Sequence, residues 1–300
     1  MNPHLGELVA LITAALWTFT SLFFARASQH IGSQAVNRLR LLLATGCLSL
    51  THFLLEGTFF PVHATPERWG WLALSAITGL ALGDGLLFYA YTLIGPRLAM
   101  VLMATVPVMS VLLAWLFLGE ALNTTELLAI FITVIGVGWV VLEQQPAEDP
   151  DTQRRASVPG ILCGLGAAAG QAVGLILSKR GMTGDFPALS ASLIRVTVAS
   201  LSVWIIALPR REVGSTLRAL RDPQTRNPIL LGTIFGPSLG MTLSLVAVQL
   251  SEVGIASTLM ALSPVMMLPI AHWQLQEHIT ARAVIGTLAA MCGVGMLFLL

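Results

Sequence analysis

The run LMATVPVM at Leu102–Met109 occurs again, 157 residues later, as LMALSPVM at Leu259–Met266. Other landmarks match at the same offset: Gly79 and Gly83 with Gly236 and Gly240, Pro107 with Pro264, Glu120 with Glu277, and Gly136 and Gly138 with Gly293 and Gly295. A leucine-rich composition produces chance identities, but it does not place glycines, prolines and glutamates in register. The chain therefore contains an internal repeat.

The bulk composition places this chain in a lipid bilayer. Of the 300 residues, 55% are hydrophobic and 10% are charged, and the mean hydropathy is +0.81. A soluble domain carries about 25% charged residues. The net charge of +1 gives no electrostatic case for a nucleic-acid partner. Cys47, Cys163 and Cys292 lack metal-ligand spacing, so we expect neither a metal nor another cofactor.

Apolar runs long enough to cross the hydrocarbon as helices, about 20 residues each, occur ten times. We therefore expect an all-α integral membrane protein with loops too short for a soluble domain. The ten predicted spans are Leu5–Phe24, Val36–Leu55, Trp69–Tyr91, Leu98–Phe117, Glu126–Leu142, Val158–Leu177, Ala188–Leu208, Pro228–Val248, Ile255–Gln274 and Ala281–Leu300.

The repeat divides these spans into two groups of five. We expect a first five-helix repeat at residues 1–145, a polar linker at 146–157 and a second repeat at 158–300. Because five is odd, the second copy starts on the opposite face of the membrane, which makes this an inverted-topology repeat. Such repeats are typical of secondary transporters, which bind substrate near the midplane between their halves.

Two segments resemble a known family. GPRLAMVLMATVPVMSVLLAWLFLGEAL at Gly95–Leu122 resembles the fourth span of EamA-type transporters, and LWTFTSLFFAR at Leu16–Arg26 is similar to their tryptophan-bearing first span. These proteins form one branch of the drug/metabolite transporter superfamily. The resemblance covers the whole chain and implies a secondary carrier, often an exporter, for small metabolites such as amino acids or for drugs. The sequence departs from the family pattern at Asp84 and at Gln171, where tryptophan is expected.

The predicted substrate site lies where glycine- and proline-interrupted spans of the two halves meet. Gly79, Gly83, Gly236 and Gly240 are candidate hinges, with close helix packing as the alternative for the first two. Proline frees a backbone carbonyl, and side chains four residues apart share a helix face. The residues expected to bind substrate are Trp17, Thr20, Asp84, Phe88, Tyr91, Pro107, Trp115, Gln171, Pro264 and His272. Together these residues would form a mostly aromatic cavity with a few polar groups, which suits a small amphiphilic molecule.

Asp84 is a carboxylate deep in an apolar span. A charge there costs about 2.5–3.5 kcal/mol on insertion scales, so it must face the bundle interior, a partner or water. Its repeat counterpart is Met241, so the charge is not part of a symmetric scaffold. We predict that Asp84 binds a coupling proton or pairs with a cationic group of the substrate. The alternative is a structural pairing with Arg40, Arg195 or a neighbouring amide.

Four other charged residues are expected to serve mainly structure. Glu120 and Glu277 close their spans just before helix starts, where they would fix the turn between spans. Arg40 and Arg195 lie within about two turns of their span starts, so their side chains can reach the headgroups. Contact of these arginines with substrate or with an acid is the alternative.

Three classes of membrane protein compete, and a secondary carrier rather than an enzyme is our prediction. An enzyme acting on lipid-linked substrates needs a cluster of acids, histidines or metal ligands, which the scattered histidines do not form. A channel-like facilitator needs a repeated selectivity element, which the unrepeated Asp84 does not supply.

The predicted setting is the cell's inner membrane, which the chain crosses many times as a monomer. Its expected partners are a small-molecule substrate, the bilayer and, as a coupling ion, the proton. The arginine and lysine count over the loops places the termini outside, whereas the family resemblance implies termini in the cytoplasm. These two indications conflict.

Overall fold

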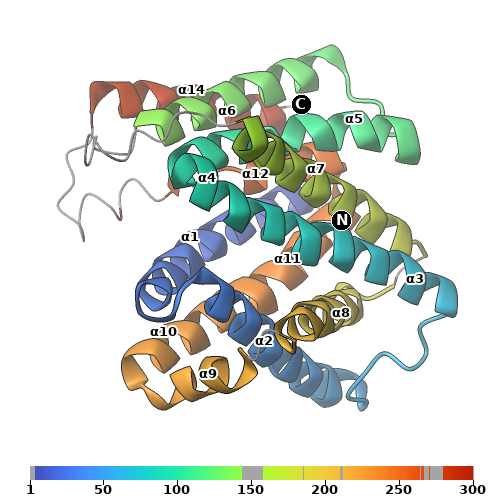
Figure 1. Ribbon diagram of the computed structural model, residues 1–300. Coiled ribbons are helices and arrows are strands. Elements are labelled where there is room, and N and C mark those ends of the chain that lie inside the picture. The colour runs from blue at the N-terminus through green and yellow to red at the C-terminus, as the bar shows by residue number, and fades with distance from the viewer. Residues whose placement is uncertain are drawn as a thin grey trace.

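The computed structural model describes residues 4–143, 158–184, 186–209, 212–263, 265–266, 270 and 280–299. Over these residues the chain is helical and contains no β-strand. The helices pack into one bundle (Figure 1). The predicted all-helical class is confirmed.

The first repeat runs from α1 to α6. Its elements are α1 (Leu5–Ile31), α2 (Ser33–Glu56), α3 (Pro66–Ser75), the π-helical η1 (Ala76–Gly83), α4 (Asp84–Met103), α5 (Val106–Leu118) and α6 (Thr124–Glu143). A capping box precedes α6: Asn123 Oδ1 accepts a hydrogen bond from the Glu126 amide at 2.8 Å, and Glu126 Oε2 accepts one from the Asn123 amide at 2.7 Å. This local signal fixes the start of α6.

The described part of the second repeat follows the same order of helices and adds two short elements, α9 and η3. Its elements are α7 (Val158–Gly181), α8 (Ala188–Ala207), α9 (Val213–Arg218), the 3₁₀ turn η3 (Ala219–Arg221), α10 (Pro223–Thr233), the π-helical η4 (Ile234–Gly240), α11 (Met241–Leu250), α12 (Val253–Met260) and α14 (Ala281–Leu299). Element boundaries recur at the sequence offset of 157: Pro66 and Pro223 open α3 and α10, Gly83 and Gly240 end η1 and η4, and Thr124 and Ala281 open α6 and α14. The sequence repeat is thus also a repeat of helix boundaries.

Most of the predicted spans correspond to apolar helices. Among the described residues, six helical segments are long and apolar enough to cross a membrane: Leu5–Ser28, Ser33–Glu56, Pro66–Leu87, Val158–Gly181, Ala188–Ala207 and Pro223–Leu250. Three shorter apolar helices are Val106–Leu118, Thr124–Val140 and Val284–Leu297. Much of the predicted ninth span, Ile255–Gln274, lies outside the described residues.

The predicted break between the third and fourth spans differs from the observed one. We expected the third span to end at Tyr91 and the fourth to begin at Leu98, but α4 is helical through this region and ends at Met103. The helix is interrupted instead at Ala104 and Thr105. The following Pro107 has no N–H to bond to the Met103 carbonyl, so the break falls just before the proline. In the second repeat α12 ends at the matching Met260.

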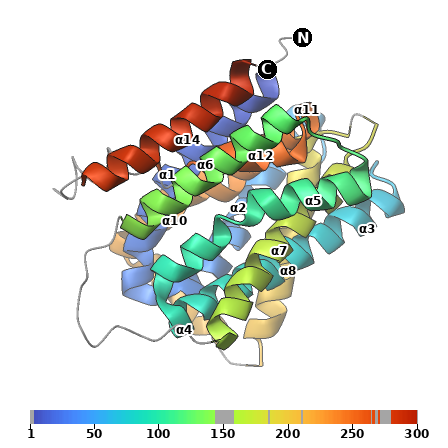
Figure 2. The same cartoon turned by 90° about the horizontal axis from the view of Figure 1, so that it is seen from above.

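Helices α6 and α14 join the two repeats at one edge of the bundle, where they lie side by side (Figures 1 and 2). The contact depends on small residues. A Cβ atom added at Gly136 of α6 would lie 2.7 Å from the Gly286 carbonyl oxygen, and one at its repeat counterpart Gly293 would lie 2.6 Å from the Ala129 carbonyl oxygen. Glycine therefore lets these two backbones approach closely.

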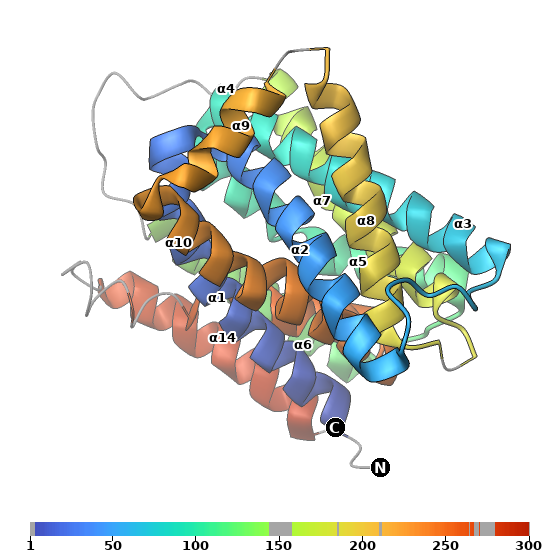
Figure 3. The ribbon, with the colours of Figure 1, turned by 90° about the horizontal axis from the view of Figure 1, so that it is seen from below.

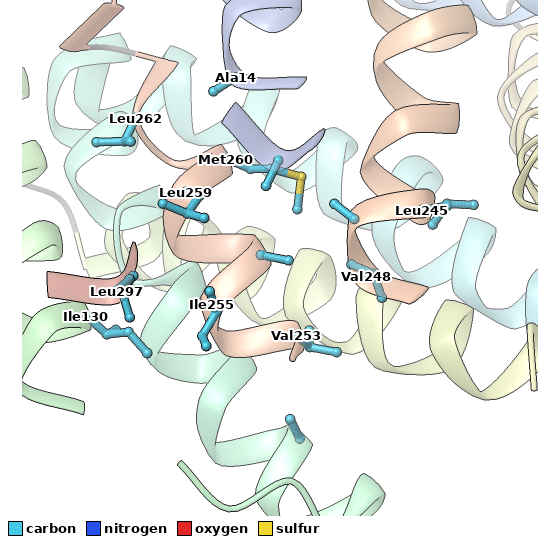
Figure 4. Close-up of a cluster of buried hydrophobic side chains, with 14 of the residues drawn as sticks. Ala14, Ile130, Leu245, Val248, Val253, Ile255, Leu259, Met260, Leu262 and Leu297 are labelled. Carbon is cyan, nitrogen blue, oxygen red and sulfur yellow. The ribbon is translucent and has the colours of Figure 1, made fainter. Parts of the chain in front are cut away.

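The apolar core lies around α12. Ile255, Leu259 and Met260 of this helix pack with Leu245 and Val248 of α11 and with residues of α1, α6 and α14 (Figure 4). All of the labelled side chains in this cluster are buried. The core thus connects elements of both repeats.

The bundle has two faces that we name by their elements. The terminal face is where α1 begins and α14 ends (Figure 3), together with the ends of α5, α7 and α11, which contact one another there. The α9 face is the opposite one. There Arg38 of α2 forms an ion pair with Glu212 and donates a hydrogen bond to Thr216 at 3.4 Å, which fastens α9 to the bundle.

Candidate functional site

A cavity of about 420 Å³ lies between the two repeats. Its wall is mostly apolar, with a few hydroxyl, amide and charged groups. The residues that line it are Trp17, Thr20, Ser21, Phe24, Arg40, Leu41, Leu80, Asp84, Leu87, Met103, Ala104, Val106, Val137, Gln171, Leu175, Gly236, Pro237, Met241, Ser257, Met260, Ala261 and Ser263. Residues of both repeats therefore line one cavity.

The two π-helical segments form matching parts of this site. A Cβ atom added at Gly170 of α7 would lie 2.8 Å from the Thr78 carbonyl oxygen of η1. One added at Gly236 of η4 would lie 2.9 Å from Thr20 Oγ1 of α1. Each repeat's π segment is thus pressed against the first helix of the other repeat. A π turn carries one extra residue and occurs frequently at functional sites.

Asp84 begins α4 directly after η1, and both of its carboxylate oxygens have partners. Arg40 Nη2 lies 2.5 Å from Oδ2, and Gln171 Nε2 donates to Oδ1 at 2.8 Å. Gln171 Nε2 also lies 3.2 Å from the Gly79 carbonyl oxygen. Asp84 and Arg40 belong to the first repeat and Gln171 to the second, so the carboxylate joins the two.

Arg40 is held in place by two further contacts. Its Nε donates to Asn37 Oδ1 at 2.8 Å, one turn earlier in α2. Its guanidinium lies 5.7 Å from the centre of the Phe24 ring, within cation–π range. The geometry corresponds to the structural pairing that we kept as the alternative for Asp84. A role for Asp84 in coupling stays a prediction.

Arg195 is the positional counterpart of Arg40, because each lies seven residues after the first residue of its helix, α8 and α2. Its surroundings differ. The residue is 3% exposed. Its Nη1 lies 3.3 Å from the sulfur of Met241, and its Nε has no hydrogen-bond partner. Met241 is the counterpart of Asp84, so the second repeat places a thioether where the first repeat places a carboxylate. The expected reach of either arginine to the headgroups is not observed, because both guanidinium groups turn into the bundle.

The cavity brings together part of the predicted substrate site. Trp17, Thr20, Asp84 and Gln171 line it. Pro107 is buried at the start of α5, beside the lining residue Val106. Phe88 and Tyr91 lie on α4, but their side chains are outside the described residues, as are Pro264, His272 and Glu277 as a whole.

Trp115 does not reach this cavity, and its side chain is 60% exposed. The buried residues of α5 are Pro107, Ser110 and Ala114. At 3.6 residues per turn, the position seven residues after Pro107 returns to nearly the same face, whereas the eighth is rotated from it by about 80°. The buried face of α5 therefore continues from Pro107 to Ala114, and Trp115 lies off it.

Glu120 ties helix ends together at the terminal face. Its Oε1 lies 2.6 Å from Lys179 Nζ, and its Oε2 accepts a hydrogen bond from the Val253 amide at 2.8 Å. Lys179 also donates to the Ser251 carbonyl at 2.8 Å. These contacts join the end of α5 in the first repeat to the end of α7 and the start of α12 in the second.

A second, more polar hollow of about 350 Å³ opens beside the end of α2. His52 is 2% exposed there, with Nδ1 2.6 Å from the Thr58 carbonyl oxygen and Nε2 3.0 Å from Ser190 Oγ. Since a carbonyl only accepts, Nδ1 carries a proton. Both ring nitrogens are satisfied within the fold, so His52 fastens the loop after α2 to the start of α8.

Sequence reasoning missed Met241, Phe24 and Asn37. The signal for Met241 was available, because Asp84 aligns with Met241 at the offset of 157, and Arg40 aligns with Arg195 at the offset of 155 that the second span of each repeat follows. Phe24 and Asn37 acquire their roles only through the packing of α1 against α2. In the described part of the chain, no group of three or more His, Cys, Asp or Glu side chains is placed to hold a metal ion.

The fold and its cavity define a multi-pass membrane protein with two related halves. The family model described as the EamA-like transporter family matches residues 4–142 and again residues 158–299. The chain belongs to the EamA-like transporter family, within the drug/metabolite transporter superfamily, and is a membrane transporter.

A solved structure described only as "Crystal structure of protein" is similar to this chain along nearly its whole length. The TM-score is 0.77 and the sequence identity is 17%, and the match covers 98% of this chain and 96% of that chain. At this identity the likeness establishes the fold alone. No curated protein sequence matches the chain.

Proposed function

We propose that this transporter is a secondary carrier that exports or exchanges small amphiphilic metabolites, such as amino acids or drugs, by alternating access. The observation that carries the proposal is the cavity between the repeats, whose wall includes Leu80 of η1 and Pro237 of η4. Its volume of about 420 Å³ falls among small-molecule sites, which measure roughly 300–1,000 Å³. Its apolar wall with few polar groups suits an amphiphile.

The two moving halves in this proposal are the repeats at residues 1–145 and 158–300, joined by the linker at 146–157. Their inverted relation follows from five spans in each, and it makes inward- and outward-facing shapes nearly equivalent. The hinges are Gly79, Gly83, Gly236 and Gly240, which lie in η1 and η4. The absence of a Cβ atom and the wide π turn both favour local change of the backbone.

In this proposal, the contact of Glu120 with Lys179 and Val253 is what closes the terminal face. It spans the two repeats, so it must separate when that face opens. The side chains of Lys179 and Glu120 are 25% and 13% exposed, respectively. A partly buried pair of this kind contributes more than an exposed one, which is worth about 0–1 kcal/mol.

The proposed coupling ion is the proton, and Asp84 is the residue proposed to bind it. Protonation would remove the negative charge that holds Arg40 and Gln171, and so release a link between the repeats. The transporter would work as a monomer in the inner membrane, because one chain supplies both halves of the cavity.

The test is transport in reconstituted vesicles. Metabolites released by cells that overproduce the protein would first identify candidates, which are then measured as flux into proteoliposomes with and without a pH gradient. Asp84→Asn is expected to abolish flux or its pH dependence. Asp222→Asn is the matched control, because Asp222 caps α10 from an exposed position. Full, still pH-dependent flux through the Asp84 variant would disprove the coupling role.

A further inference from the structure

Three charged side chains lie in or directly behind the cavity wall, and their charges do not cancel. Arg40 and Asp84 line the cavity, and Arg195 lies behind the lining residue Met241. Arg40 and Asp84 neutralise each other in an ion pair. Arg195 reaches the same region, since its Nη2 would lie 3.7 Å from a Cβ atom added at Gly79, but both oxygens of Asp84 are already bonded to Arg40 and Gln171. The described side chains around this cluster therefore carry a net positive charge, which resides on Arg195.

Arg195 is a buried cation without a described chain carboxylate bonded to it. It is 3% exposed, its Nε has no partner, and its Nη1 faces a thioether sulfur, which is a weak acceptor. A buried charge that lacks a partner is costly to the fold. A charge kept at this cost directly behind a side chain that lines the cavity calls for a ligand that compensates it.

The comparison of the two repeats identifies what kind of group would compensate Arg195. In the first repeat, Arg40 of α2 bonds a carboxylate at the first residue of α4. In the second repeat, Arg195 of α8 meets Met241 at the first residue of α11. The same backbone geometry thus presents a guanidinium to a carboxylate in one half and to a thioether in the other.

Met241 separates Arg195 from the cavity. Its side chain lines the cavity while its sulfur contacts the guanidinium. Methionine is unbranched with three side-chain torsions, so it adapts easily to a ligand. A change of Met241 rotamer would expose the Arg195 guanidinium to a molecule in the cavity without any movement of the backbone.

We propose that Arg195, covered by Met241, is the binding site for a carboxylate group of the transported molecule. This inference rests on the proposed function and adds the chemical class of the substrate. The apolar body of that molecule would lie against Trp17, Leu80 and Met260, which line the same cavity. Since Asp84 is already paired, the site favours an acid over an amine of the same shape.

The preference for an acid is tested with three compounds that share one apolar body and differ in their polar group: 3-phenylpropanoate, its amide and 3-phenylpropylamine. Each is titrated against the purified full-length protein in detergent, by calorimetry and by the shift of the unfolding midpoint. The acid is expected to bind, the amide more weakly, and the amine weakest. Arg195→Gln should weaken acid binding by about ten- to a hundredfold, as loss of a charged hydrogen bond predicts, while amide binding stays unchanged.

A second pair of variants keeps the test valid if Arg195→Gln does not fold. Met241→Asp gives Arg195 a carboxylate from the chain itself, as in the first repeat, and should raise the unfolding midpoint while abolishing acid binding. Met241→Leu is the matched comparison, since it conserves volume without charge, and it should bind the acid more tightly than Met241→Asp does. Unchanged acid binding in Met241→Asp, or tighter binding of the amine than of the acid to the wild type, would overturn the proposal.

Flux of the same probes into proteoliposomes separates this inference from the proposed function. Protein-dependent flux of all three probes without preference for the acid would contradict the carboxylate site and leave the carrier function supported. Acid binding that depends on Arg195, without protein-dependent flux, would support the site and contradict the carrier function.

Discussion

Lys179 and Glu120 lie 2.6 Å apart, Nζ to Oε1, and join the end of α7 to the end of α5 across the terminal face. This is a link between the two repeats, since α5 belongs to the first and α7 to the second. Because Glu120 also accepts the Val253 amide, one carboxylate holds three helix ends together. Loss of this contact should therefore affect how often the terminal face opens.

Lys179→Gln should open the terminal face more often. The loss of a partly buried ion pair, about 1 kcal/mol, shifts an open–closed equilibrium about fivefold. The measurement is the labelling rate of Ser257→Cys, a cavity position, by an impermeant thiol reagent added from the terminal face. Cys47, Cys163 and Cys292 are replaced beforehand. Arg180→Gln, at the exposed neighbouring position, is the control, and equal labelling in both variants would exclude this closure.

The Arg40–Asp84 pair should show strong coupling in a double-mutant cycle. Removing one partner of a buried pair costs about 3–5 kcal/mol, because the other charge is left unpaired. Arg40→Gln with Asp84→Asn should therefore cost less than the sum of the single variants. Unfolding of the detergent-solubilised protein measures this, with Arg26→Gln at an exposed position as control. Additive losses would mean that the two side chains act independently.

Glu252 should make stability depend on pH. It lies outside the spanning helices, between α11 and α12. Burial, and then the carboxylates of Glu126 and Glu120, raise its pKa above the ordinary 4.5, against the opposing effect of Lys179. An acid with a raised pKa in the folded state binds its proton more tightly when folded. Its contribution to stability is therefore full below about pH 4.5 and is lost as the pH rises through the folded pKa.

Replacing Glu252 by Gln should remove this loss. The unfolding midpoint of the wild type is expected to fall relative to that of Glu252→Gln as the pH is raised from about 4 to about 8. One oxygen of Glu252, Oε2, is buried without a hydrogen-bond partner, so the neutral amide is well tolerated. A constant difference between the two proteins over this range would contradict the raised pKa.

The α6–α14 contact should be sensitive to single methyl groups. Gly136→Ala would place a Cβ atom 2.7 Å from the Gly286 carbonyl oxygen and should destabilise the fold by about 1–3 kcal/mol, the usual cost of overpacking. Gly138 is in the same helix, and a Cβ atom there would meet nothing within 4 Å. Gly138→Ala is thus the matched control, because it gains the same helix propensity without a clash, and an equal loss of stability in both variants would contradict a packing role specific to Gly136.

Trp17 and Trp115 should differ in their effect on substrate choice. Trp17 lines the cavity, whereas Trp115 is 60% exposed. Trp17→Leu is expected to change the relative flux of the transported compounds with a smaller change in the unfolding midpoint. Trp115→Leu should leave the relative flux unchanged. An altered profile in the Trp115 variant alone would place the substrate elsewhere.

The helix class and the repeat could be predicted because both are written in local patterns. Apolar runs predict the spans. Gly79, Pro107 and Glu120 each have an identical residue 157 positions later, which reveals the repeat. The break before Pro107 was misplaced because Gly95 and Pro96 form an equally strong local signal. In the folded chain, packing of α4 against its neighbours outweighs that signal.

The candidate site was predictable only in part. Asp84 and Gln171 stood out as polar residues in apolar spans, and both line the cavity. That Asp84 pairs with Arg40, rather than with Arg195, depends on which helices cross, and no local pattern encodes this. The expectation for Trp115 rests on two steps of four residues from Pro107. A spacing of eight rotates the side chain by about 80° from the face of Pro107, whereas a spacing of seven nearly retains that face.

The π-helical segments η1 and η4 also set the phase of the helices that follow them. One additional residue per segment turns everything downstream by about 100°. Asp84 and Met241 come immediately after these segments, so the added residue determines which side chain each half aims at its own arginine. An α-helix without that residue would aim Asp84 away from Arg40, even though every amino acid of the pair were still present.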